Sequence, residues 1–182
     1  MKFGKEIALC AVTLMLIAGL TTAALSVTNA LTAETIAARA SEEADRARRQ
    51  VITADAFEEI SLGDTGADKI TCCRALRGGA TVGYVFTVTT SGKSSGLTVM
   101  TGIDADGVVT GVVITEENET AGYVDTVTKG GLPASFTGRP AGRFDIGQNI
   151  DKVSNATKTS KGVIKAVNTA CAWFATVREV SE

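Results

Sequence analysis

The first part of the chain is an uninterrupted apolar segment. No charged residue occurs between Ile7 and Ala33, and Ala, Leu, Val, Ile and Thr dominate that stretch. A helix needs roughly 20 apolar residues to cross the hydrocarbon core of a bilayer. The pattern therefore predicts a transmembrane anchor over residues 1–33.

A cleaved signal peptide is the alternative interpretation of this segment. Lys2 and Lys5 form a positive N-terminal region, and Thr28-Asn29-Ala30 ends in a small residue. The apolar stretch is far longer than the apolar core of a signal peptide, and a helical pattern continues beyond it. We therefore favour the anchor.

Polar residues appear at regular spacing after the anchor. Residues 34–50 are rich in Ala, with Glu and Arg three or four positions apart, which predicts a solvated helical stalk. Residues 51–182 then form the remaining domain. Its first ten residues are compatible with a short helix that is capped at Thr53 or Asp55 and turns Phe57 and Ile60 inward.

The middle of the domain has the pattern of β-strands. Residues 81–89 are β-branched and aromatic, and residues 92–96 form a polar connection. The apolar runs 97–103 and 108–114 flank Asp104-Ala105-Asp106-Gly107, and an Asp-Gly turn between such runs predicts a hairpin.

Apolar residues recur at helical spacing near the C-terminus, from Val163 to Phe174. This periodicity predicts a helix over residues 161–178 that begins around residues 159–161. A β-rich middle followed by a helix indicates an α+β fold, with an antiparallel sheet and packed helices.

Composition narrows the possible functions. The 182 residues carry a net charge of −2, so the chain lacks the concentrated basic face of nucleic-acid binders, and we expect no nucleic-acid partner. The chain has no histidine, the commonest metal ligand and the usual general base. We therefore expect no hydrolase triad, no catalytic side chain and no metal site.

The four cysteines are Cys10, Cys72, Cys73 and Cys171. Cys10 lies in the apolar N-terminal segment, and the vicinal pair lacks the C-x-x-C spacing of redox and zinc motifs. We interpret Cys72 and Cys171 as small buried side chains. A disulfide that involves Cys171 stays an open alternative for an oxidising compartment.

The segment Ser154-Asn155-Ala156-Thr157-Lys158-Thr159-Ser160 leads into the predicted C-terminal helix. It resembles the S-G-A-T-x-T-S element of the FMN-binding subunits of Rnf and Na⁺-translocating quinone reductase complexes. In that family the Thr at the fourth position carries FMN through a phosphoester bond, so the resemblance implies covalent FMN on Thr157. Asn155 stands where the family usually has Gly, which is tolerable because Asn readily adopts left-handed backbone conformations.

Upstream, Glu119-Thr120-Ala121-Gly122-Tyr123-Val124 resembles the family's E-T-P-G-L-G element, which lies near the flavin. Ala121 replaces Pro, Tyr123 replaces Leu and Val124 replaces the last Gly. A solvated strand exit is the alternative interpretation of this acidic segment. Besides Thr157, the two elements together imply these FMN-binding residues: Ser154, Asn155, Ala156, Thr159, Ser160, Glu119, Thr120 and Gly122.

Physical chemistry also favours a phosphate beside Thr157. If Thr159 or Ser160 caps the following helix, the Thr157 hydroxyl lies close to the unpaired amides at the positive end of the helix dipole. Ser154 and Ala156 are small, so backbone amides can approach phosphate oxygens. An ordinary Ser/Thr-rich helix cap is the alternative interpretation.

The resemblance implies the G-type, electron-carrying flavoprotein subunit of an Rnf-like complex in a bacterial cell membrane. Such a subunit works only within a redox-driven, ion-translocating oxidoreductase. The expected partners are the other membrane subunits, especially the second FMN-carrying one, and a flavin transferase for maturation. The expected topology is single-pass, with a cytoplasmic N-terminus and residues 51–182 outside the cytoplasm. Lys2 and Lys5 favour this orientation, whereas the arginines of the stalk oppose it.

Two other functions are kept as alternatives: a pilin-like assembly protein, and a membrane-anchored extracytoplasmic ligand-binding domain without a redox cofactor. The pilin-like interpretation gives Thr157 no role, and Glu6 is poorly placed relative to Gly4 for the usual processing signature. Both alternatives predict a colourless protein. The flavoprotein interpretation predicts a yellow protein whose fluorescence survives SDS gel electrophoresis.

Overall fold

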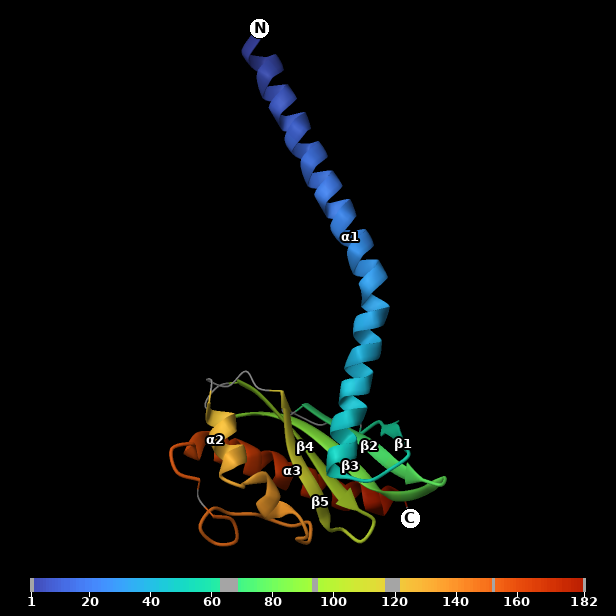
Figure 1. Ribbon diagram of the computed structural model, residues 1–182, viewed down its shortest axis with the longest axis vertical. Helices are drawn as coiled ribbons and strands as arrows, with labels where there is room; N and C mark the ends of the chain where they lie inside the picture. Colours follow the sequence, from blue (N-terminus) through green and yellow to red (C-terminus); the bar gives the residue numbers. More distant parts are fainter. Residues whose placement is uncertain (1, 63–68, 93–94, 117–121, 152, 182) are drawn as a thin grey trace. The chain divides into compact units, whose positions relative to one another are not determined.

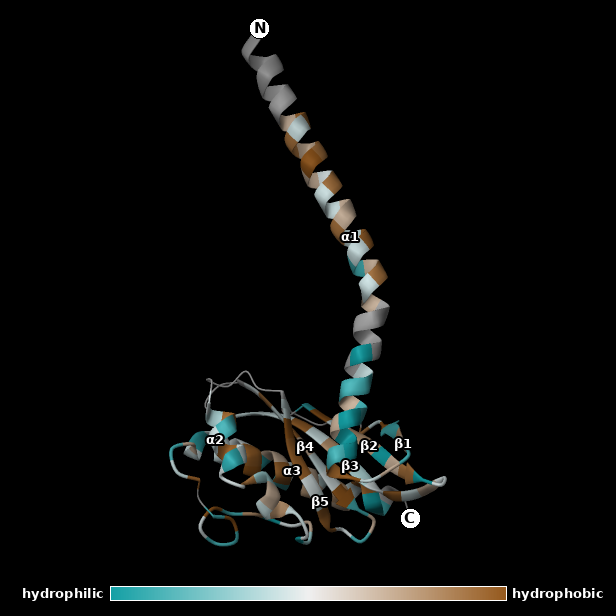
Figure 2. Cartoon of the chain, viewed as in Figure 1, coloured by the Kyte–Doolittle hydropathy of each residue, from teal (hydrophilic) through white to brown (hydrophobic). Residues whose placement is uncertain are grey.

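The computed structural model describes residues 2–62, 69–92, 95–116, 122–151 and 153–181. The chain begins with one long helix, α1 (Lys2–Val51), shown in Figure 1. Within α1, Ala11–Ala33 has a mean hydropathy of 1.8 and is long and apolar enough to cross a membrane. Figure 2 shows that hydrophilic residues replace this apolar segment in the C-terminal part of α1. The predicted apolar helix and its helical continuation are both confirmed.

The chain divides into two compact units, residues 1–44 and 45–182. The second unit contains a five-stranded sheet in the order β1-β2-β3-β4-β5. Every neighbouring pair in this sheet is antiparallel. The strands are β1 (Ala56–Ile60), β2 (Lys69–Arg77), β3 (Ala80–Ser91), β4 (Ser95–Asp104) and β5 (Val109–Glu116). The predicted α+β class with antiparallel pairing is confirmed.

The hairpin between β4 and β5 forms where the Asp-Gly turn predicted it. The Asp104 amide donates to the Val108 carbonyl at 2.9 Å, and the Val108 amide donates to Asp104 Oδ1 at 2.8 Å. Gly107 has a φ of 82°, in the left-handed region where glycine carries no steric cost. The side chain of Asp104 therefore reinforces the turn.

The sequence interpretation was wrong for the start of the domain. Residues 56–60 form the edge strand β1 rather than a short helix, and β2 was not predicted at all. In β2 the adjacent residues Cys72 and Cys73 are both buried, because protein covers both faces of the sheet there. Without alternation of polar and apolar residues, the pattern that identifies a half-buried strand is lost.

Three helical elements cover one face of the sheet: α2 (Tyr123–Lys129), the 3₁₀ helix η1 (Pro133–Phe136) and α3 (Thr157–Ser181). The main core lies between this layer and the sheet. Phe136 is fully buried in it and makes an edge-to-face contact with Phe144, with ring centroids 5.1 Å apart. The prediction of a helix at 161–178 is confirmed, although α3 extends further at both ends.

The last turns of α1 pack against the opposite face of the sheet, around buried Val51, Ile52 and Met100. Glycines make this close approach possible. A Cβ atom added to Gly102 would lie 2.5 Å from the Val51 carbonyl oxygen, and one added to Gly111 would lie 2.9 Å from Val51 Cα. Backbone contact with these glycines therefore positions the end of α1 within the second unit.

Candidate functional site

A pocket of about 490 Å³ lies at the start of α3. Its wall consists of six consecutive residues of the C-terminal motif, Ser154 to Thr159, together with Tyr123 from α2. None of the described residues that line this pocket is acidic. The structure thus makes a concave site from the segment that the sequence singled out.

The loop before α3 makes a turn at Ser154 and Asn155. Asn155 has a φ of 65° and is the one non-glycine residue with a positive φ in the described part of the chain. Asn tolerates this left-handed conformation better than most residues, because its short polar side chain can form local hydrogen bonds. The expectation that Asn replaces Gly here without disrupting the loop agrees with this geometry.

The helix begins earlier than expected. Thr157 is the first residue of α3, and the Ser160 amide donates the first helical hydrogen bond to the Ala156 carbonyl at 2.9 Å. The prediction that Thr159 or Ser160 caps the helix is therefore wrong, since both lie within its first turn. The Ser160 hydroxyl also donates to the Ala156 carbonyl at 2.9 Å, so this serine is satisfied inside the helix.

The hydroxyl-bearing residues of the motif differ in exposure. Thr157 is half-buried and lines the pocket, whereas Thr159 and Ser160 are 0% and 1% exposed. A phosphoester needs a hydroxyl that a flavin donor can reach. Among the three helical hydroxyls of the motif, this geometry favours Thr157, and Thr159 and Ser160 support the helix from within.

The second motif is only partly described. Glu119, Thr120 and Ala121 lie outside the described residues. Gly122 directly precedes α2 and has a φ of 89°, which glycine adopts without strain. The next residue, Tyr123, lines the pocket beside the first motif. The described end of the second motif therefore meets the first motif in space.

The pocket has the features that a phosphate group requires. The first amides of an α-helix have no acceptor within the helix and lie at the positive end of its dipole. Lys158, an exposed residue in the pocket lining, adds a positive charge. The residues present thus fit the phosphate end of FMN, and the aromatic ring of Tyr123 provides an apolar contact for a planar group.

Two residues of this pocket, Tyr123 and Lys158, were not among the predicted FMN-binding residues. The sequence carried a signal for each: Tyr123 directly follows Gly122, and Lys158 directly follows Thr157. Which side chains of a motif line a pocket depends on where the helix begins, and that start was predicted two to four residues too late.

The cysteines of the domain form no second redox centre in the described residues. Cys72, Cys73 and Cys171 are buried free thiols, as the interpretation of small buried side chains predicted for Cys72 and Cys171. Burial raises the pKa of the Cys72 thiol to about 12 and also raises the pKa of Cys73 and Cys171. The described residues contain no cluster of potential metal ligands.

Comparison with known proteins gives matches over both parts of the chain. Residues 1–51 match the RnfG N-terminal region, and residues 92–172 match the FMN-binding domain family. The chain is also 33% identical over 177 residues to the G-type subunit of the Na⁺-translocating ferredoxin:NAD⁺ oxidoreductase complex of Acetobacterium woodii, with 85% of each chain covered. The FMN-binding match contains both motifs that form the pocket.

Proposed function

Because the chain belongs to the RnfG family of Rnf-complex subunits, we propose that it carries FMN as a phosphoester on Thr157. Family membership and the FMN-binding domain identify an electron-carrying flavoprotein subunit of a redox complex. The covalent link and its position go beyond that assignment. They are supported by the site at the start of α3.

The observation that carries the proposal is the position of Thr157. It is the first residue of α3, its side chain is half-buried, and it lines a pocket with five of the six other residues of its motif. A phosphate attached there would lie within reach of the first-turn amides of α3, where the helix dipole stabilises negative charge. Thr159 and Ser160 also carry hydroxyl groups, but these residues are 0% and 1% exposed, so a flavin donor would not reach them.

In this proposal the chain supplies position and electrostatics, and bound FMN supplies electron transfer. The amides at the start of α3 and Lys158 hold the phosphate. Tyr123 lines the pocket opposite the loop and limits the space beside it. The covalent bond prevents loss of the cofactor, so the subunit keeps its place in an electron-transfer chain without rebinding FMN.

The apolar segment Ala11–Ala33 acts as a single membrane anchor in this proposal. The N-terminus lies in the cytoplasm, and the FMN-binding domain lies outside it. The chain's partners are the neighbouring membrane subunits of an ion-translocating complex, especially a second FMN-carrying subunit, with whose cofactors bound FMN would exchange electrons. A flavin transferase attaches the FMN.

Intact-mass spectrometry of the membrane-extracted chain tests the attachment. We expect one FMN per chain, flavin fluorescence that survives SDS gel electrophoresis, and a modified peptide that contains Thr157. Thr157→Ala should remove all gel-stable fluorescence, because alanine has no oxygen to form the ester. Its circular dichroism spectrum should match that of the native chain, since the side chain is only half-buried.

Thr157→Ser is the matched control, since it keeps the hydroxyl at the first position of α3. This variant should retain gel-stable fluorescence. Full flavin content in Thr157→Ala would overturn the assignment of Thr157. A native chain with the mass of the bare polypeptide, produced together with an active flavin transferase, would overturn covalent attachment altogether and favour an anchored ligand-binding domain.

A further inference from the structure

A second pocket, of about 550 Å³, lies near the other end of α3. Its walls come from the end of β1, from β2 and β3, from the β4–β5 turn and from residues 173–178 of α3. Phe174 is 17 positions beyond Thr157, which corresponds to about 25 Å along the helix axis. The pocket is therefore separate from the motif at the start of α3.

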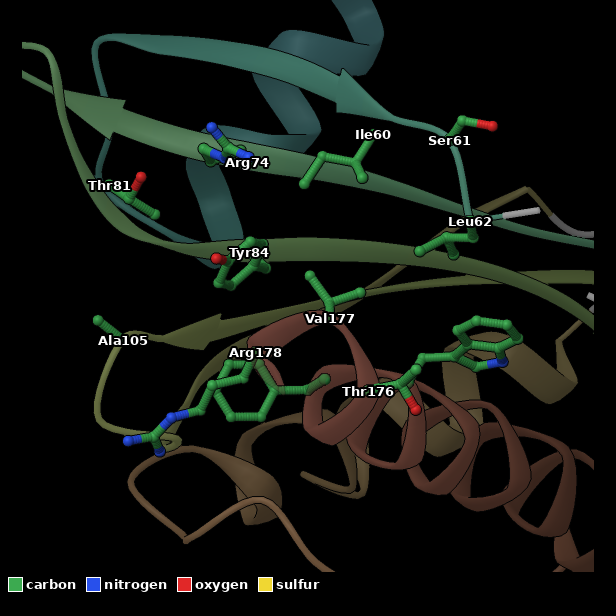
Figure 3. A pocket seen from close by; sticks show the side chains of 12 residues that line it. Ile60, Ser61, Leu62, Arg74, Thr81, Tyr84, Ala105, Thr176, Val177 and Arg178 are labelled. Atoms are coloured by element: carbon green, nitrogen blue, oxygen red, sulfur yellow. The ribbon is translucent and has the colours of Figure 1, made fainter. Parts of the chain in front are cut away.

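Part of the wall of this pocket is apolar and aromatic. Ile60 and Val177 face each other there, as Figure 3 shows, and Leu62 continues the apolar wall. Tyr84 and Phe174 make an edge-to-face contact with ring centroids 6.0 Å apart. Trp173 also lines the pocket and is only half-buried. These walls suit a ligand with an aromatic or short aliphatic body.

The wall also carries a cation that forms no ion pair with the described residues. Arg74 lines the pocket and is half-buried, and its Nε atom is fully buried without a hydrogen-bond partner. Arg74 lies directly opposite Tyr84 in the β2–β3 register, so both side chains point to the same face of the sheet. Figure 3 shows Thr81 and Tyr84 close to Arg74.

The neighbouring carboxylate does not neutralise Arg74. Glu58 is its partner in the β1–β2 register, but none of the ion pairs between described residues includes Arg74. Glu58 is exposed and is not part of the pocket lining. A second arginine, Arg178, lines the same pocket, and none of the described residues that line it is acidic. The site therefore favours an anionic group.

We propose that this pocket binds a small aromatic monocarboxylate. The carboxylate accepts hydrogen bonds from the terminal nitrogens of Arg74, whose planar guanidinium matches two carboxylate oxygens. The aromatic body lies against Tyr84, Phe174 and Trp173. A singly charged carboxylate fits better than a doubly charged phosphate, because the walls are largely apolar and desolvation of the second charge is costly. The proposal does not depend on how FMN is attached.

Titration of the full-length flavinylated chain in detergent with 3-phenylpropionate tests this assignment, with isothermal calorimetry as the readout. The neutral amide of the same acid serves as a ligand control, and empty micelles correct for partitioning. We expect the native chain to bind the acid at least tenfold more tightly than the amide. In Arg74→Gln this preference should disappear, because the charge that distinguishes the two ligands is gone.

Arg143→Gln is the matched protein control, because that side chain is 84% exposed, pairs with Asp145 and lies outside the pocket lining. It should keep the native preference for the acid. Glu58→Gln should strengthen binding of the acid, since a negative charge that repels the bound carboxylate is removed from the neighbouring strand position. Equal affinity of the native chain for acid and amide, or an unchanged preference in folded Arg74→Gln, would overturn the proposal.

Discussion

The two pockets at the ends of α3 are similar in volume but are lined by different kinds of residues. At the start of the helix, loop residues, the first helical turn and Lys158 make up most of the lining. Near its end, the lining includes three aromatic side chains and two arginines from different elements. The first arrangement depends on where the backbone turns, and the second depends on how side chains pack. Substitutions at the two ends should therefore have separable effects on flavin content and on stability.

The largest effect on stability is expected for Phe174→Ala, at the end of α3. Phe174 is 5% exposed, and its ring lies between Tyr84 and the glycine turn at Gly107. Removing a buried phenyl ring leaves a cavity, so we expect the free energy of unfolding to fall by about 4 kcal/mol. Denaturant titration followed by circular dichroism measures this change. Covalent FMN per folded chain should stay at the native level.

Thr176→Ala is the control for that experiment, because Thr176 is exposed on the same helix. Its free energy of unfolding should stay within about 0.5 kcal/mol of the native value. If Phe174→Ala instead lost its FMN while it remained folded, the two ends of α3 would be coupled, and the contrast between them would fail.

The two pockets also differ in how far the sequence alone could predict them. The pocket at the start of α3 is lined largely by consecutive residues, so a short sequence motif was enough to identify Thr157 and its neighbours. The Arg74 pocket joins β1, β2, β3 and α3, and it depends on a register that no local pattern encodes. The periodicity of β2 was obscured because Cys72 and Cys73 are both buried. The sequence pattern therefore did not indicate which residues lie next to Arg74.

Local sequence patterns also predicted some secondary-structure elements correctly and misplaced others. The β4–β5 hairpin was predicted because its turn residues act within four positions of each other. The start of α3 was misplaced because Ser and Thr are good caps in isolation. In the structure Thr159 and Ser160 are buried instead, and the Ala156 carbonyl accepts the first helical hydrogen bond. Tertiary packing, which the sequence pattern does not report, decided this boundary.

The pH dependence of the unfolding free energy tests the burial of Cys72, which lies in the core next to Arg74. Burial raises the pKa of the Cys72 thiol from 9.0 to about 12, so the folded state keeps its proton where the unfolded state loses it. Stability from this group is complete below pH 9 and is lost as pH rises towards 12. We expect a loss of about 2 kcal/mol between pH 9 and pH 11.

Comparison with Cys72→Ala isolates that effect, since every other side chain is present in both proteins. The difference in unfolding free energy between the native chain and the variant, measured under reducing conditions, should shrink as pH rises from 9 to 11. A constant difference across that range would mean that the thiol titrates alike in the folded and unfolded states. Such a result would mean that water reaches the Cys72 thiol in the folded state.

The smallest stability effect, and the most informative one for the start of α3, is expected for Asn155. Its φ of 65° places any residue with a Cβ in the left-handed region, which costs about 1 kcal/mol for alanine and nothing for glycine. Asn155→Ala should therefore lose about 1 kcal/mol of stability and take up FMN more slowly, because the loop before Thr157 relaxes from its turn. Asn155→Gly, which restores the residue usual in the family, should load FMN at least as fast as the native chain. Gel fluorescence over time after induction, in cells that contain a flavin transferase, measures the loading rate. Equal loading of the alanine and glycine variants would show that the backbone turn at residue 155 is not what prepares Thr157 for modification.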